Sequence, residues 1–299
     1  MHLHSSAAAA AFLSLGLAAT PQGCVVDVGG TKGEIVRVEK RFAVTGVPDL
    51  TLVTFDGSVE VRAWDRDELL VEIEKRGVDR SDAESIEVRA EQTGNKVTVE
   101  AVKPRRANVV VQFGISPSAR LVATVPRRCN LVAKSGDGSV IIERLAGRVE
   151  VDTGDGSVRA VDIEGAIRLH TGDGAIRVTD LDGPADLDTG DGSVQLNGRL
   201  STLRLRTGDG SVSVRAESGS AMGDDWEVRT GDGGITLELP DGFAANLDAD
   251  AGDGRVRLEG ESSDARSERR QRTLRTELNG GGKLLRVRTG DGSIVIKRL

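Results

Sequence analysis

The chain has no tyrosine and few other aromatic residues, with 5 Phe and 2 Trp among 299 residues. A globular core of this size normally uses aromatic side chains, because each of them buries a large area. Glycine is abundant instead, at 38 residues. A narrow stack of aliphatic columns needs little aromatic bulk and many turns, so the composition favours a repeat architecture.

Cysteine and histidine are also scarce, with 2 and 3 residues. At most one disulfide is possible, between Cys24 and Cys129. His170 is the only histidine beyond residue 4, and it falls on an outward strand position. We therefore expect no nucleophile triad, no metal site and no cofactor. Acidic and basic residues are interleaved around a net charge of −7. Nucleic acid is not an expected partner, because it requires a concentrated basic stripe.

The N-terminus predicts export. Residues 1–23 resemble a signal peptide, because the apolar run at 7–19 is too short to span a bilayer as a helix. Cys24 follows directly and resembles a bacterial lipoprotein acceptor, although the residues before it depart from the usual pattern. Lipidation of Cys24, cleavage after Ala19 and no processing all stay open. We expect a cell-envelope protein, in the periplasm or at the surface, with 24–34 as a tether and a lipid anchor as its only membrane contact.

The tripeptide Gly-Asp-Gly dominates the second half of the chain. The first five of its eight copies are spaced by 18 residues, and the later gaps of 23, 21 and 38 indicate loop insertions. The largest insertion, residues 260–282, predicts a projecting arm or a short extra pair of strands. The copies begin at Gly136, Gly154, Gly172, Gly190, Gly208, Gly231, Gly252 and Gly290.

Each 18-residue unit contains two stretches in which apolar and polar residues alternate, such as Val158 with Ala160 and Ile167 with Leu169. Alternation with a period of two is typical of a half-buried strand. Two strands and two turns fit one coil of a flattened solenoid. We predict an all-β fold: a single-stranded parallel β-solenoid over 35–299, with regular coils from about residue 131 and N-terminal strands continuous with them. A mid-unit apolar column is expected at the second corner, at Leu145, Ile163, Leu181 and Leu200.

The repeated aspartates and threonines form two further columns. If the coils are in register, neighbouring carboxylates lie about 5 Å apart and repel by about 0.9 kcal/mol in bulk water. One explanation is structural: the aspartate accepts hydrogen bonds from backbone N–H groups, and its flanking glycines permit positive φ. The other is calcium between coils, although one carboxylate per coil supplies few of the six to eight oxygens that calcium prefers. The threonines predict stacking with hydroxyl hydrogen bonds.

Three segments carry a resemblance to a known family: residues 55–65, the successive Thr-Gly-Asp-Gly-Ser-Val turns, and residues 285–294. They resemble the bacterial β-strand-repeat family labelled "putative adhesin", a domain of unknown function, over roughly residues 35–299. The resemblance implies a β-solenoid fold and envelope association. It brings no catalytic residues.

These observations together predict a non-catalytic, adhesin-like binding or scaffolding module. Its expected partner is an envelope protein, a polymer or further copies of the chain. One alternative is a self-assembling structural filament, since end coils expose strand edges. A second alternative is a polysaccharide-active β-helix enzyme, which would need paired carboxylates in a cleft.

Overall fold

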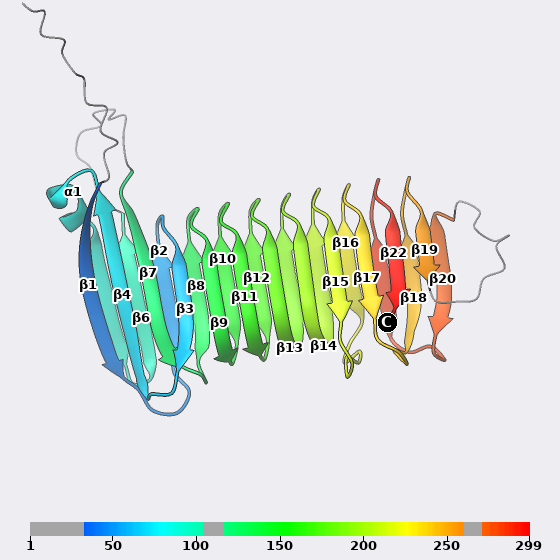
Figure 1. The fold of residues 1–299 in the computed structure, drawn as a ribbon, viewed down its shortest axis with the longest axis horizontal. Helices are drawn as coiled ribbons and strands as arrows, with labels where there is room; N and C mark the ends of the chain where they lie inside the picture. Colours follow the sequence, from blue (N-terminus) through cyan, green and yellow to red (C-terminus); the bar gives the residue numbers. More distant parts are fainter. Residues whose placement is uncertain (1–32, 104–115, 260–270) are drawn as a thin grey trace, which may run out of the picture. The chain divides into compact units, whose positions relative to one another are not determined.

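The computed structural model describes residues 33–103, 116–259 and 271–299, and the predicted signal peptide, Cys24 and most of the tether lie outside these ranges. The all-β prediction is confirmed: the described residues form one extended system of 22 strands with a single short helix. Residues 32–299 cluster as one compact unit. The strands stack side by side along one direction (Figure 1).

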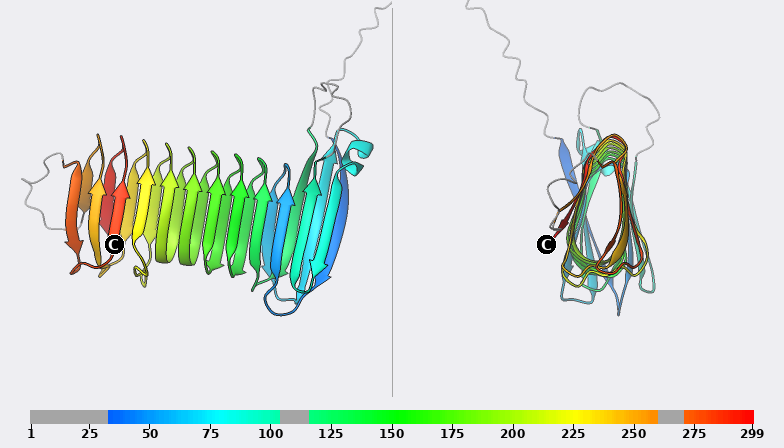
Figure 2. Two further views of the ribbon diagram at one scale, coloured as in Figure 1. Left: turned by 180° about the vertical axis from the view of Figure 1, so that it is seen from behind. Right: turned by 90° about the vertical axis from the view of Figure 1, so that its right-hand side faces the viewer.

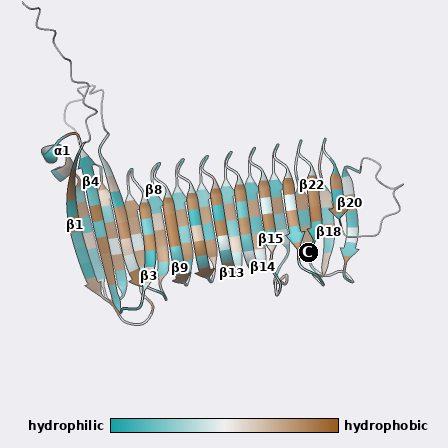
Figure 3. Ribbon diagram, in the orientation of Figure 1, coloured by the Kyte–Doolittle hydropathy of each residue, from teal (hydrophilic) through white to brown (hydrophobic). Residues whose placement is uncertain are grey.

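Apolar and polar residues alternate along the strands, and this alternation sets the core. In β10 (Val149–Thr153) and β12 (Ile167–Thr171), every second side chain is buried. Figure 3 shows the same alternation of hydrophobic and hydrophilic residues across the stack. Viewed along its length, the stack shows strands on two sides of a narrow interior (Figure 2, right). The inward-facing aliphatic residues fill that interior in continuous columns.

The basic unit is a rung, which we define as two strands joined by a Gly-Asp-Gly turn, here called the glycine corner. Strands of successive rungs pair in parallel between residues 18 positions apart, as in Val149 with Ile167 and Val158 with Ile176. The remaining central strands are β8 (Asn130–Ser135), β9 (Val140–Ala146), β11 (Val158–Glu164), β13 (Ile176–Thr189), β14 (Val194–Thr207) and β15 (Val212–Ala216).

The N-terminal strands continue the parallel stack only in part. β2 and β3 stack on β8 and β9 as a rung does, although Phe55 stands where the corner has its first glycine, and β6 and β7 pair in parallel with β2 and β3. β1, β4 and β5 pair antiparallel, which corrects the prediction that all N-terminal strands continue the coils. These elements are β1 (Glu34–Ala43), β2 (Asp49–Thr54), β3 (Val59–Trp64), β4 (Glu68–Gly77), α1 (Arg80–Glu84), β5 (Glu87–Thr93), β6 (Lys96–Val102) and β7 (Ser118–Pro126).

The C-terminal rungs do not stack in the order of the sequence. β21 lies between β16 and β18, and β22 lies between β17 and β19. One further strand, β20, pairs antiparallel with β18, so the predicted extra pair of strands is a single added strand within the described residues. The bounds are β16 (Trp226–Thr230), β17 (Ile235–Leu239), β18 (Ala245–Asp250), β19 (Val256–Glu259), β20 (Thr273–Leu278), β21 (Leu284–Arg288) and β22 (Ile294–Arg298).

The glycine corners bring backbone against backbone. A Cβ added to Gly156 would lie 2.1 Å from the carbonyl oxygen of Gly138 in the preceding rung, and one added to Gly174 would meet Gly156 in the same way. Apart from Gly252, the Gly-Asp-Gly glycines do not have φ in the left-handed range. The prediction that these glycines supply positive φ was therefore wrong. They are required because no side chain fits between stacked corners.

The threonine before each corner ties one rung to the previous one, as predicted. The buried hydroxyl of Thr171 lies 3.0 Å from the oxygen of Gly154 and 2.9 Å from that of Gly156, and it accepts from the N–H of Gly174 at 3.3 Å. The corner carbonyls of one rung are thus satisfied by the threonine of the next. Buried backbone acceptors need such partners because an unpaired one costs free energy.

The second corner of each rung, opposite the glycine corner, follows the predicted apolar column only in part. Leu145, Ile163 and Leu181 align, but β14 places Gly198 beside Leu181 and shifts Leu200 beside Gly183. In the three preceding rungs, a residue with positive φ stands just before this column: Arg144, Asp162 and Asp180. β14 has one residue, Asn197, where β13 has two, Thr179 and Asp180, so β14 lacks the bulge and its chain passes the corner one residue earlier.

We expect Gly156→Ala to destabilise the stack by at least about 1–3 kcal/mol, because its methyl group would meet a backbone oxygen that cannot move without shifting a rung. Gly234→Ala is the matched control, since its Cβ would meet only the oxygen of Ser293 at 3.5 Å, an ordinary contact. Urea unfolding of the two variants measures the difference. Equal stability of both would show that corner packing does not require glycine.

Candidate binding face

The strands that precede the glycine corners project outward side chains at two positions in each rung. Along the first of these positions the charge alternates in sign at every step of the stack, and we call this row the charge ladder. In stack order, its members are Glu150, Arg168, Asp186, Arg204, Glu227, Arg286 and Asp248. Neighbouring parallel strands lie about 4.8 Å apart, so each inner charge has an opposite charge on both sides.

Several ion pairs join the rungs along this face. Arg168 lies 3.2 Å from Asp186, and Glu227 lies 3.0 Å from Arg206 and 4.0 Å from Arg204. The arginines are about half exposed or more, so each such pair contributes only about 0–1 kcal/mol. The ladder therefore acts more on the choice of rung order and register than on total stability.

The ladder accounts for the exchanged order of the last rungs. If β18 stacked directly on β16, Glu227 would face Asp248; β21 places Arg286 between them. On the other side of the stack, Lys297 of β22 separates Glu238 from Glu259, and its ammonium lies 3.5 Å from the Glu238 carboxylate. Like charges directly opposite each other destabilise a sheet, so the ladder positions favour the observed order, although β21 also places Arg288 opposite Arg229 in the neighbouring row.

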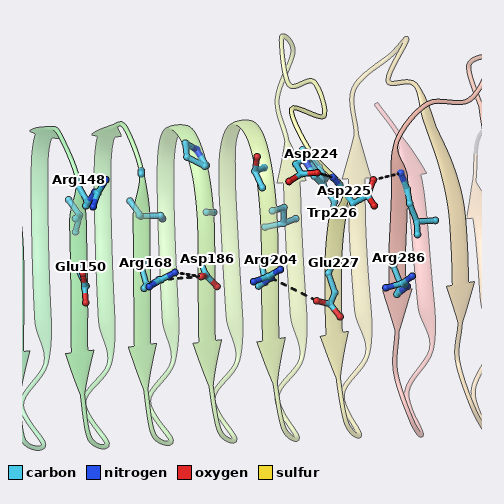
Figure 4. A pocket seen from close by; sticks show the side chains of 18 residues that line it. Arg148, Glu150, Arg168, Asp186, Arg204, Asp224, Asp225, Trp226, Glu227 and Arg286 are labelled. Atoms are coloured by element: carbon cyan, nitrogen blue, oxygen red, sulfur yellow. Dashed lines mark hydrogen bonds and ion pairs between the residues drawn. The ribbon is translucent and has the colours of Figure 1, made fainter.

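A groove of about 650 Å³ follows the charge ladder across six rungs (Figure 4). Small residues, Ala166, Pro184 and Thr202, line its middle, each directly before the first core residue of the outward-facing stretch. Arg148 lies at one end, and Asp224 and Asp225 lie toward the other. The result is an elongated depression with charges of both signs along one side.

The inserted loop between β15 and β16 shapes this second end. A carboxylate oxygen of Asp225 accepts from the N–H of Leu284 at 2.9 Å, and the ammonium of Lys283 donates to the carbonyl of Gly223. The buried indole of Trp226 donates to the carbonyl of Ser201 at 3.3 Å. The 23-residue repeat spacing indicated the insertion, but nothing in it predicted that the loop borders a groove.

A second, smaller hollow of about 320 Å³ lies on the outward face of β1, β4, β7 and β3. Arg120 bridges two carboxylates there, Glu60 at 2.6 Å and Glu74 at 3.1 Å. A hydrogen bond from Arg37, supported by Arg120, lowers the pKa of Glu74 against the opposing effect of burial. Glu74 is therefore a poor general acid, because a carboxyl group with a lowered pKa stays ionised.

The repeated aspartates form an exposed ridge at the glycine corners. The predicted hydrogen bonds from backbone N–H groups to these carboxylates are not found within the described ranges, where only Asp253 has a charged partner, Arg272 at 3.5 Å. The corners are tied by the threonine hydroxyls instead. No group of three or more His, Cys, Asp or Glu side chains is placed to hold a metal ion in the described part of the chain.

Two further candidate residues, Cys129 and His170, have no neighbours that would make them reactive in the described part of the chain. Burial first, and then the charge of Asp49, raise the pKa of the Cys129 thiol to about 12. This thiol is therefore unreactive at neutral pH. His170 is exposed on the outward face, 3.5 Å from Asp188. Cys24, the candidate lipidation site, lies outside the described residues and stays a prediction.

The family model described as Toastrack DUF4097 matches residues 48–297. The chain belongs to this Toastrack family. No curated protein matches it. Two similar solved structures are putative adhesins: one from Parabacteroides merdae (11% identity, 89% of this chain, 97% of that chain, TM-score 0.45) and one from Bacteroides fragilis (10%, 88%, 97%, 0.42). A third, a putative lipid binding protein from Parabacteroides distasonis, has 12% identity, 89% and 98% coverage and a TM-score of 0.46.

In the described ranges of this Toastrack chain, no helix is long and apolar enough to cross a bilayer.

The aspartate ridge predicts a stabilising substitution. Asp191→Asn removes repulsion from Asp173 and Asp209, and we expect a gain of about 0.5–1 kcal/mol at low salt that vanishes at high salt. Asp186→Asn is the matched control with the opposite sign, because Asp186 lies between Arg168 and Arg204 of the charge ladder. Thermal melts at two salt concentrations test both. A loss of stability in Asp191→Asn would favour the hydrogen-bonded turn instead.

Asp248 makes the C-terminal rungs sensitive to acid. A hydrogen bond from Arg288 at 2.5 Å, and a weaker one from Arg275, lower its pKa below the ordinary value of 3.8 despite burial. A depressed folded-state pKa stabilises above the unfolded value, and this stability is lost as pH falls through the folded value. Between about pH 5 and pH 2, Asp248→Asn should therefore lose less stability than the parent chain in thermal melts. An identical pH dependence would contradict this role for Asp248.

Proposed function

We propose that the protein is a non-catalytic, adhesin-like module of the cell envelope, built as a parallel β-solenoid with 18-residue coils. The groove along the charge ladder is the observation that supports this function most directly. It extends over six rungs, offers charges of both signs and lies on a rigid sheet. Such a surface suits an extended envelope polymer or protein segment, which makes repeated weak contacts rather than entering a closed pocket.

The chemistry of the groove supports binding over catalysis. Its ladder carboxylates, Glu150, Asp186 and Glu227, each neighbour at least one arginine of the ladder. Glycoside hydrolysis requires two carboxyl groups facing each other across a bond, one of them protonated. The ladder carboxylates are instead spaced along a row, on alternate rungs, with arginines between them. The face is thus arranged for recognition.

Export and tethering complete the proposal. The apolar run before Cys24 supports secretion through a signal peptide, and the cysteine offers a lipid attachment point. Mass spectrometry of the mature N-terminus tests this part separately. An acylated Cys24 would establish anchoring, cleavage elsewhere would leave a free exported module, and an intact Met1 would refute export.

The binding role is tested by a substitution that fills the groove. Thr202→Trp places a large side chain on the groove floor, whereas Ser213→Trp adds the same side chain to an exposed position on the other strand set. We expect the first variant to lose at least about tenfold in affinity for isolated cell walls or envelope polysaccharides, or about 1.4 kcal/mol, and the second to bind normally.

Two results would oppose this proposal. Equal binding by both tryptophan variants and the parent chain would mean that the groove is not the binding face. Turnover of a glycan that a single carboxylate substitution abolishes would establish an enzyme instead.

A further inference from the structure

The final rung, β21–β22, fills a slot whose walls come entirely from earlier parts of the chain. β16 and β18 form the walls for β21, and β17 and β19 form those for β22. We name residues 283–299 the donor segment. In Figure 1, its two strands lie between those walls rather than at the end of the stack.

The slot recognises the donor segment through three kinds of contact. Parallel pairing on both edges satisfies the backbone groups of both strands. Four side chains of the segment, Leu285, Val287, Ile294 and Ile296, are completely buried. The hydroxyl of Thr289 lies 2.8 Å from the oxygen of Gly233 in the next glycine corner.

Charge makes this recognition specific. The donor segment has five basic side chains and one acidic side chain, an excess of four positive charges. The outward positions of the slot walls carry five acidic and two basic side chains: Glu227, Glu238, Asp248, Asp250, Glu259, Arg229 and Arg257. An approaching segment of opposite charge is therefore attracted to the slot.

The link to the donor segment has the character of a hinge. Residues 279–282 read Asn-Gly-Gly-Gly and connect β20 to β21. Asn279, Gly280 and Gly281 have φ of 49°, 84° and 77°. Glycines can adopt other backbone conformations at little steric cost, so the segment can be released from β20 without unfolding it.

We propose that the donor segment of one copy occupies the slot of a second copy, so that this Toastrack protein associates by exchanging its C-terminal rung. The contacts in an exchanged pair are the same as within one chain, and only the hinge changes. This route goes beyond ligand binding at the groove and does not depend on it. The occupant is an identical segment, because its apolar and basic positions already match the slot in the single chain.

Full-length chains carrying single cysteines test the exchange. Thr236 and Val295 are register partners across β17 and β22, and both face outward. Chains with Thr236→Cys are mixed at high concentration with chains carrying Val295→Cys, both in a Cys24→Ser background, warmed mildly and oxidised. The readout is an intermolecular disulfide between positions 236 and 295, identified by peptide mass spectrometry.

Two matched controls accompany this mixture. Ser213→Cys replaces Thr236→Cys in the first, because Ser213 lies one strand further from β22 and measures chance collisions. The second is a single chain with both Thr236→Cys and Val295→Cys, whose own disulfide retains the donor segment and should keep the protein monomeric. Arg286→Glu with Lys297→Glu, placed in the Val295→Cys chain, should reduce cross-linking because acids would then face acids.

We expect severalfold more 236–295 cross-link than the Ser213→Cys mixture gives, increasing with protein concentration. A yield equal to that of the Ser213→Cys mixture would overturn the proposal. So would a yield that the two charge reversals leave unchanged, because the cross-link would then not arise from a seated rung.

Discussion

Close contact between the backbones of stacked glycine corners is the constraint on which the rest of the structure depends. Where a Cβ would lie only 2.1 Å from the oxygen of the matching glycine, no other residue permits the strands to keep their hydrogen-bonding distance. The N–H of Gly154 donates to the oxygen of Gly136 at 2.5 Å, and the threonine hydroxyls bind the remaining corner carbonyls. Every rung is therefore positioned by its predecessor, and apolar columns form because the spacing is the same at each step.

A fixed spacing between rungs also gives a fixed spacing between charges. At the corners it creates a row of like charges, which is tolerated because the aspartates are exposed to water. On the flat outward face it creates the charge ladder, where alternating signs turn the same spacing into attraction. Stability thus comes mainly from the buried columns and the backbone ladder. The outward charges decide which rungs become neighbours and leave a face able to engage both signs of charge in a partner.

The strands, the core positions and the role of the corner threonines could be predicted from the sequence, because each is a local pattern repeated many times. It did not show the order of the last rungs. Each rung presents the same aliphatic pattern, as Trp226 and Val228, Leu247 and Ala249, and Leu285 and Val287 illustrate, so hydrophobic phase cannot distinguish one neighbour from another. The charges at Glu227, Asp248 and Arg286 could have done so, since only one order alternates their signs. The groove was not predictable, because it depends on the position of an inserted loop over small residues.

The ends of the stack bear on how copies can associate. Antiparallel strands form the N-terminal edges, β1 and β5, and one of the C-terminal edges, β20; β1 carries five charged side chains among its ten residues. Charged edge strands oppose pairing with another chain, so simple end-to-end growth of a filament is disfavoured. The donor slot differs because it is interior, acidic and matched to a single basic segment. In the exchange that we propose, each slot accepts one segment, and a reciprocal exchange between two copies closes the pair without leaving a free slot.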